Sequence, residues 1–158
     1  MRCITYGLGN FDPLKFREIK NNIWNNKPTG GLWCSPVDSN FGWEDWCKTE
    51  EYYQNNGLKD KFEFDIDERN SKILKIDSYT DLQKIPSYVD NLMPWPLCIR
   101  LDFETLKSQG YDAIYLTLQG LIETKNPFHD PNLCGWDCES ILIMNKDIIK
   151  NIIYYGEK

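Results

Sequence analysis

Aromatic and polar side chains that could grip a flat ligand gather between residues 28 and 47. Trp33 and Ser35 belong to a short apolar stretch typical of a strand, and Trp43 and Trp46 follow at helical spacing. Aromatic residues at such a strand-to-helix corner can simply be core. They can also wall a slot for a planar ring, with Ser35 at its lip. Both interpretations stay open from the pattern alone.

Glu139 is the first candidate for a chemically active carboxylate. It stands where a loop containing glycine and tryptophan enters the apolar stretch Ser140–Met144. A residue at the mouth of a rigid strand can project its carboxylate into a cleft. Asp137 would share that strand face if the strand begins early enough, because alternate residues share a face. The alternative is a surface carboxylate on an edge strand.

Other catalytic arrangements are disfavoured. The single histidine, His129, lies in a proline-bounded loop without an orienting acid beside it, which argues against a hydrolase with a histidine base. His129, Cys134 and Cys138 are suitable zinc ligands, but they lack a Cys-x-x-Cys pair, and we expect no metal. No glycine-rich phosphate-binding motif is present, which disfavours a nucleotide kinase or a dehydrogenase.

Composition limits the class of protein. The chain has 158 residues and a formal net charge of −6, with acidic residues spread along it. A broad nucleic-acid surface needs clustered Lys and Arg, so a nucleic-acid partner is disfavoured. The six cysteines are irregularly spaced and are expected to be free thiols in a reducing compartment. Without a leader or a spanning apolar run, we expect a cytoplasmic protein that does not bind membranes.

The periodicity predicts one α+β domain over residues 1–158, with short strands mostly separated by helices. The expected strands are 3–6, 32–34, 61–67, 73–76, 111–116, 140–144 and 151–155, with 61–67 and 73–76 able to form a hairpin. The expected helices are 14–24, 41–57, 79–85 and 103–109, with one further turn after Asn145. Ser78 and Asp102 are predicted N-caps, and residues 120–135 are predicted to form a loop.

Four segments, taken in order, resemble the ADP-ribosyltransferase family, particularly its small toxin-like and phage-associated members. The segments are Ile4–Gly7, then Gly31–Ser35 with Trp43–Cys47, then Ser108–Ile114, and finally Glu139–Met144 with Asp147–Lys150. The resemblance implies that family's fold, a split antiparallel or mixed sheet with flanking helices, and NAD as a substrate. It implies Glu139 as the catalytic residue. It implies that NAD is bound by Tyr6, Gly7, Trp33, Ser35, Trp43 and Trp46.

The implied chemistry suits these residue types. Cleavage of the nicotinamide–ribose bond builds positive charge on the ribose, which a carboxylate at Glu139 would stabilise. Trp33 with Trp46 or Trp43 would stack on the nicotinamide, and Ser35 could donate a hydrogen bond to its amide. Tyr6 stands where the family has His or Arg, and Asp137 stands where its two-acid motif has Gln or Glu.

The function implied by the resemblance is NAD-dependent transfer of ADP-ribose to a host macromolecule, a protein rather than a nucleic acid. Such a protein would be a phage or mobile-element effector or anti-defence protein, acting in the host cytoplasm. The alternative is a catalytically silent member of the fold that acts as a nucleotide-binding or protein-binding inhibitor.

Overall fold

The computed structural model describes residues 1–52, 58–90 and 98–155. In chain order the elements, with η for a short 3₁₀ helix, are β1 (Arg2–Tyr6), β2 (Leu32–Pro36), α1 (Trp43–Thr49), β3 (Lys61–Ile66), η2 (Glu68–Asn70), β4 (Ile73–Ile76), α2 (Tyr79–Leu82), β5 (Ser87–Asp90), β6 (Cys98–Leu101), α3 (Phe103–Ser108), β7 (Ala113–Leu116), α4 (Leu118–Thr124), β8 (Ser140–Ile143), η3 (Lys146–Ile148) and β9 (Ile149–Tyr154).

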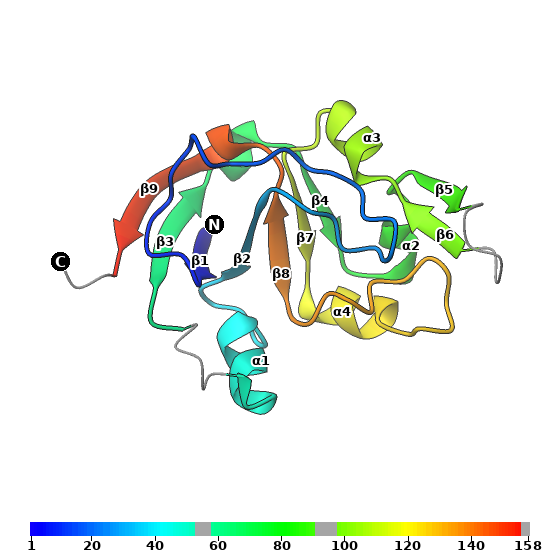
Figure 1. The fold of residues 1–158 in the computed structure, drawn as a ribbon, viewed down its shortest axis with the longest axis horizontal. Coiled ribbons are helices and arrows are strands. Elements are labelled where there is room, and N and C mark those ends of the chain that lie inside the picture. Colours follow the sequence, from blue (N-terminus) through cyan, green and yellow to red (C-terminus); the bar gives the residue numbers. More distant parts are fainter. Residues whose placement is uncertain (53–57, 91–97, 156–158) are drawn as a thin grey trace.

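One mixed sheet organises the fold, which is a single α+β domain. Its strand order is β4-β7-β8-β2-β1-β3-β9, while β5 and β6 form a separate two-stranded ribbon. Only the pairing of β4 with β7 is parallel among the described strands. Helices α2, α3 and α4 and the ribbon lie toward the β4 end, whereas α1 lies beyond the ends of β1 and β2 (Figure 1).

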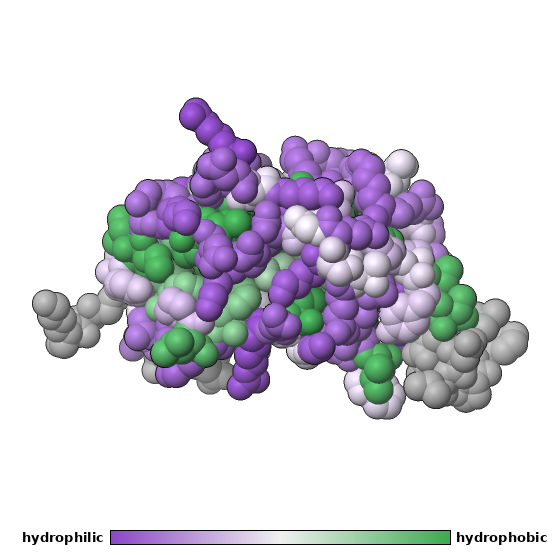
Figure 2. Space-filling view, turned by 90° about the horizontal axis from the view of Figure 1, so that it is seen from above, coloured by the Kyte–Doolittle hydropathy of each residue, from purple (hydrophilic) through white to green (hydrophobic). Residues whose placement is uncertain are grey.

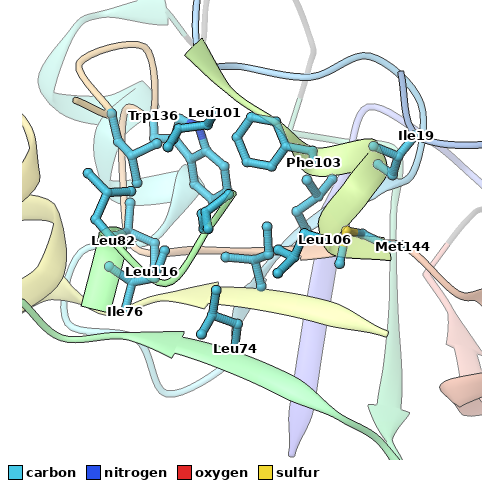
Figure 3. Packing of buried hydrophobic residues seen from close by; sticks show 14 of the residues in the cluster. Ile19, Leu74, Ile76, Leu82, Leu101, Phe103, Leu106, Leu116, Trp136 and Met144 are labelled. Carbon is cyan, nitrogen blue, oxygen red and sulfur yellow. The ribbon is translucent and has the colours of Figure 1, made fainter. Parts of the chain in front are cut away.

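Two buried clusters hold the sheet in place. The larger joins side chains of β4, β7 and β8 to α2, α3 and α4 and to Trp136, which lies beside Leu101 and Phe103 (Figure 3). The smaller contains Phe62 and Phe64 of β3, whose strand alternates buried and partly exposed side chains. Burial of apolar side chains from two sides of the sheet is the main stabilising contribution to such a domain.

Predictions that rest on local capping chemistry are confirmed. The Ser78 side chain accepts a hydrogen bond from the Asp81 N–H at the start of α2, and Asp102 accepts one from the Thr105 N–H at the start of α3. Asn145 likewise caps η3. Each oxygen satisfies a backbone donor that a helix start leaves without an intrahelical partner.

The predicted helix over residues 14–24 is wrong. This segment has turns and an isolated bridge between Lys20 and Thr29, and Leu14 is 94% exposed. Asp12 and Asn22, at the two ends of the segment, contribute to the difference, because each side-chain oxygen accepts a hydrogen bond from the backbone N–H two residues later. Such local bonds offer the backbone an alternative to the helix.

One strand pairing and two helix boundaries also differ from expectation. Strands β3 and β4 do not form a hairpin, because β3 pairs with β1 and β9 while β4 pairs with β7. Residues 120–135 are not all loop, since α4 begins after its N-cap Thr117. Helix α1 ends at Thr49, and residues 53–57 of the longer predicted helix lie outside the described residues.

The face shown in Figure 2 is mostly hydrophilic, with hydrophobic residues in several groups. Across the described part of the chain, no helix combines the length and the apolar character needed to cross a membrane. The five cysteines whose side chains are described, Cys3, Cys34, Cys47, Cys134 and Cys138, are free thiols.

Candidate functional site

A cavity of about 400 Å³ lies where β1, β2, α1 and the segment before β8 meet. Its described lining is mainly aromatic and apolar, with two charged residues. The lining residues are Ile4, Tyr6, Gly7, Lys27, Trp33, Cys34, Ser35, Trp43, Cys47, Tyr52, Leu58, Trp136, Asp137, Cys138 and Ser140. A concave, mostly apolar site with few polar groups is the usual form of a small-molecule pocket.

The cavity coincides with a short pairing between two central strands. Strands β1 and β2 pair only at Cys3–Pro36 and Ile4–Ser35, so the next partners in the register, including Tyr6 and Trp33, are not paired. The Thr5 hydroxyl instead donates to the Trp33 carbonyl at 3.0 Å. Because the sheet is incompletely closed here, side chains of both strands can line a hollow.

Glycine at position 31 lets the chain enter β2 beside β8. Gly31 has φ of +65°, and a Cβ there would lie 2.6 Å from the Ile143 carbonyl oxygen. Only glycine fits a positive φ and so close a backbone contact without strain. Trp33, two residues later, then pairs with Leu142 of β8.

Two pairs of indoles form the aromatic walls. Trp33 packs edge-to-face against Trp136, with ring centroids 4.6 Å apart, and Trp136 is 1% exposed. Trp43 stacks on Trp46 at 4.8 Å. Trp46 does not line the cavity and supports Trp43 by stacking on it. The rings are therefore held by neighbours, which lowers the entropic cost of binding.

Ser35 fastens α1 to the segment before β8. Its hydroxyl donates to the Glu139 carbonyl oxygen and accepts from the Trp43 N–H, both at 3.0 Å. A serine hydroxyl has a single O–H, so this donor is already used. Donation from Ser35 to a ligand stays a prediction, and it would require this hydroxyl to give up its hydrogen bond to Glu139. In this structure Ser35 positions Trp43.

The charged groups of the lining form one ion pair. Lys27 Nζ lies 3.2 Å from Asp137 Oδ2, and it also lies 5.5 Å from the centroid of the Trp33 ring. Both distances are within the range for favourable interaction. The pair brings one ammonium and one carboxylate to the aromatic wall.

The thiols of the cavity are poor nucleophiles. Burial raises the pKa of the Cys138 thiol to about 12, and burial also raises that of Cys47. The thiolate is the reactive form of cysteine, so both residues are protonated near neutral pH and contribute mainly apolar surface.

Glu139 lies beside the cavity but does not line it. Its Oε1 accepts from the Tyr115 hydroxyl at 2.6 Å and its Oε2 accepts from the Asn40 N–H at 3.1 Å, and the residue is 5% exposed. Its chain neighbours Cys138 and Ser140 line the cavity, whereas Glu139 does not. Glu139 precedes β8, and its side chain is held by Tyr115 and by the backbone of Asn40.

The expectation that Glu139 shares a crevice with Trp33 and Trp46 is thus not met. Its catalytic role stays a prediction. Burial, together with the hydrogen bond to Glu139, raises the pKa of Tyr115, so the phenol stays protonated and remains the donor of this bond. The carboxylate that does line the cavity is Asp137.

Tyr6 and Gly7 line the cavity at the end of β1. The Tyr6 hydroxyl donates to Glu44 Oε2 at 2.6 Å, and burial, followed by this bond, raises the pKa of Tyr6. Lys61 Nζ lies 5.8 Å from the centre of the Tyr6 ring. Tyr6 therefore offers the cavity its ring, while its O–H is used by α1.

The weakly indicated zinc ligands are dispersed. The His129 ring packs against Tyr79, Cys134 is exposed, and Cys138 lines the cavity. No group of three or more His, Cys, Asp or Glu side chains able to hold a metal occurs among the residues that the structure describes.

Sequence reasoning did not single out Lys27, Tyr52 or Trp136 as site residues. Trp136 had a usable signal, because it is a tryptophan two residues from Cys138 in the segment that leads to Glu139. Lys27 had none, because its place depends on the irregular path of residues 20–29.

Comparisons of the chain with protein-family models, with curated proteins and with solved structures found no match.

Proposed function

We propose that this protein binds a planar heteroaromatic ligand in the cavity between β1, β2 and α1. The observation that carries the proposal is the set of three indoles, Trp33, Trp43 and Trp136, around one hollow of about 400 Å³. Stacking of a base on an aromatic side chain contributes about 1–3 kcal/mol, and it is tolerant of the identity of the ring. The volume lies within the range of ordinary ligand pockets, roughly 300–1,000 Å³.

A nicotinamide or nucleobase ring is the first ligand to test. Five of the six residues that the resemblance assigns to NAD line this cavity, namely Tyr6, Gly7, Trp33, Ser35 and Trp43. The sixth, Trp46, supports Trp43. Electron-rich indole faces also favour a cationic ring such as the pyridinium of NAD.

Calorimetric titration with NAD, nicotinamide mononucleotide, nicotinamide and adenosine tests the proposal. Trp43→Leu keeps an apolar side chain but removes the flat ring, so it should weaken binding roughly 5- to 150-fold, as expected from stacking energies of about 1–3 kcal/mol. The matched control is Trp24→Leu, since Trp24 is 69% exposed and does not line the cavity. Equal losses in both variants, or no binding of any of the four compounds to the unaltered protein, would contradict it.

Transfer of ADP-ribose from NAD to a macromolecular acceptor, a protein rather than a nucleic acid, is a second candidate. The observation that favours it is a carboxylate, Asp137, in the same lining as the aromatic rings. A fixed carboxylate stabilises the positive charge that develops on the ribose as nicotinamide leaves. The resemblance gives this role to Glu139, so the two carboxylates have to be tested side by side.

Release of nicotinamide from NAD, followed by proton NMR, separates these possibilities. Loss of release in Asp137→Asn but not Glu139→Gln assigns the chemistry to Asp137, and the reverse assigns it to Glu139. Binding of NAD without release by the unaltered protein would leave the binding function and remove the transferase.

A further inference from the structure

The lining of the cavity has already used several of its neutral hydrogen-bond donors within the protein. The Ser35 hydroxyl donates to Glu139 and the Ser140 hydroxyl donates to Cys138. The Tyr6 hydroxyl donates to Glu44, and the Trp136 indole N–H donates to the Asn26 carbonyl at 2.8 Å. These groups shape the cavity but have no O–H or N–H left for a ligand.

Lys27 and Asp137 are different, because they keep spare capacity. An ammonium has three N–H donors and a carboxylate has two oxygens, whereas their mutual contact uses one N–H and Oδ2. Their side chains are 39% and 30% exposed, respectively. A charged donor and a charged acceptor therefore lie side by side at the aromatic wall.

The indole walls offer a ligand no hydrogen-bond acceptor. An indole has an N–H and no lone pair in the ring plane, so Trp33 and Trp43 can only donate. A ligand N–H that enters the cavity therefore finds its strongest described acceptor at Asp137. Lys27, beside it, is the corresponding donor for a ligand carbonyl oxygen or ring nitrogen.

We propose that the Lys27–Asp137 pair recognises the amide-like edge of the bound ring, a carbonyl oxygen or ring nitrogen next to an N–H. The Lys27 ammonium donates to the ligand acceptor, and the Asp137 carboxylate accepts from the ligand N–H. The ligand class is thus a heteroaromatic amide or amidine, such as the carboxamide of nicotinamide or the amino edge of adenine. This inference rests on the proposed binding function.

The same pair disfavours anionic groups at this position. A carboxylate or phosphate that approaches Lys27 also meets the negative charge of Asp137 only 3.2 Å away from the ammonium. Like charges at such distances repel each other, and a buried or half-buried carboxylate has to be paired. The pair therefore suits a neutral ligand edge that carries both a donor and an acceptor, rather than a phosphate.

Matched ligand pairs test the inference by calorimetric titration. Nicotinamide is compared with 3-acetylpyridine, which keeps the carbonyl but lacks the N–H, and 9-methyladenine is compared with 9-methylpurine, which lacks the amino group and has no other N–H. In the unaltered protein at least one pair should show a preference of roughly 10-fold or more for the N–H-bearing member, the size expected for one hydrogen bond to a charged group at the lower end of its range. Asp137→Ala should reduce that preference to within about twofold, and Lys27→Met should weaken both members.

Asp147→Ala is the matched control, because Asp147 is exposed on η3 and does not line the cavity. Urea unfolding of each variant checks that the domain is intact. Equal affinity within both pairs in the unaltered protein would overturn this inference while leaving the binding function. A preference that survives in Asp137→Ala would overturn it as well. No measurable binding of any of the four compounds would also overturn this inference, and the binding function falls with it only if NAD, nicotinamide mononucleotide and adenosine fail to bind as well.

Discussion

Residues 137–140 meet two different environments on their two sides. On one side Asp137, Cys138 and Ser140 line an aromatic hollow, and Asp137 has spare hydrogen-bonding capacity. On the other side Glu139 is buried, and each of its carboxylate oxygens accepts a hydrogen bond from a neighbouring group.

The comparison separates the burial of a carboxylate from its access to a ligand in the cavity. The Glu139 carboxylate joins β7, through Tyr115, to the turn at Asn40, so its contacts are those of a structural group. Asp137 is more exposed and less constrained, yet it is the carboxylate that a ligand in the cavity can reach. The following predictions test this division, from the largest expected effect to the smallest.

Trp136 belongs to both regions, because it forms the back of the cavity and the edge of the larger core cluster. Trp136→Ala should lower the free energy of unfolding by about 3–5 kcal/mol, as large-to-small changes at buried aromatic residues do. Urea denaturation measures the loss. Trp24→Ala, at an exposed position, should change it by less than about 0.5 kcal/mol. Similar losses in the two variants would contradict the assignment of Trp136 to the core.

Glu139→Gln should lower the free energy of unfolding by about 1–3 kcal/mol, because an amide cannot accept hydrogen bonds on both sides as the carboxylate does. Ligand affinity should change by less than about twofold. Asp137→Asn should give the opposite pattern, with little change in stability and weaker binding. Urea denaturation and calorimetry on the two variants test both halves. A stable Glu139→Gln protein that has lost binding would instead assign ligand binding to Glu139.

Ser35→Ala removes the hydroxyl that joins α1 to the segment before β8. Two hydrogen bonds are lost, so the free energy of unfolding should fall by about 1–2 kcal/mol. Because the Trp43 N–H loses its partner, binding of a flat ligand should weaken as well. Thermal unfolding and ligand titration of the same sample measure the two effects. An unchanged affinity would show that Trp43 does not depend on Ser35 for its position.

Asp81 provides a small effect away from the cavity. The hydrogen bond from Lys84, followed by that from Ser78, lowers the pKa of Asp81 to about 2. A folded pKa below the ordinary value of about 3.8 means that the stabilisation is present above about pH 4 and is lost as the pH falls toward about 2. Partly exposed pairs of this kind contribute less than about 1 kcal/mol. Asp81→Asn should therefore show a slightly flatter acid-unfolding profile and unchanged ligand binding.

Local chemistry was predictable from the sequence, and long-range pairing was not. The caps at Ser78 and Asp102 need only a side-chain oxygen and the next turn of backbone, so the residues themselves indicate them. The partner of β4 depends instead on which strand reaches it in the folded sheet. Its pairing with β7 follows from the packing of the whole domain, which no local pattern contains.

The site was predictable only in part, because some of its residues lie in one local stretch and others are placed by the fold. The aromatic stretch containing Trp33 and Trp43 indicated a slot, and both residues line the cavity. The direction of Glu139 could not be inferred, because the residue lies in the irregular segment before β8, where the alternation of a strand does not apply. Strand β8 begins at Ser140, as predicted, but that boundary does not determine where the side chain of the preceding residue points.

The most direct test of the central claim is to follow the indole N–H signals of the six tryptophans by NMR during titration with a flat heteroaromatic ligand such as nicotinamide mononucleotide. Single substitutions assign the signals. The account predicts saturable shifts of Trp33 and Trp43, which line the cavity, and none of Trp24, which is exposed elsewhere. Unchanged signals for Trp33 and Trp43 with nicotinamide mononucleotide, NAD and adenosine alike would contradict it.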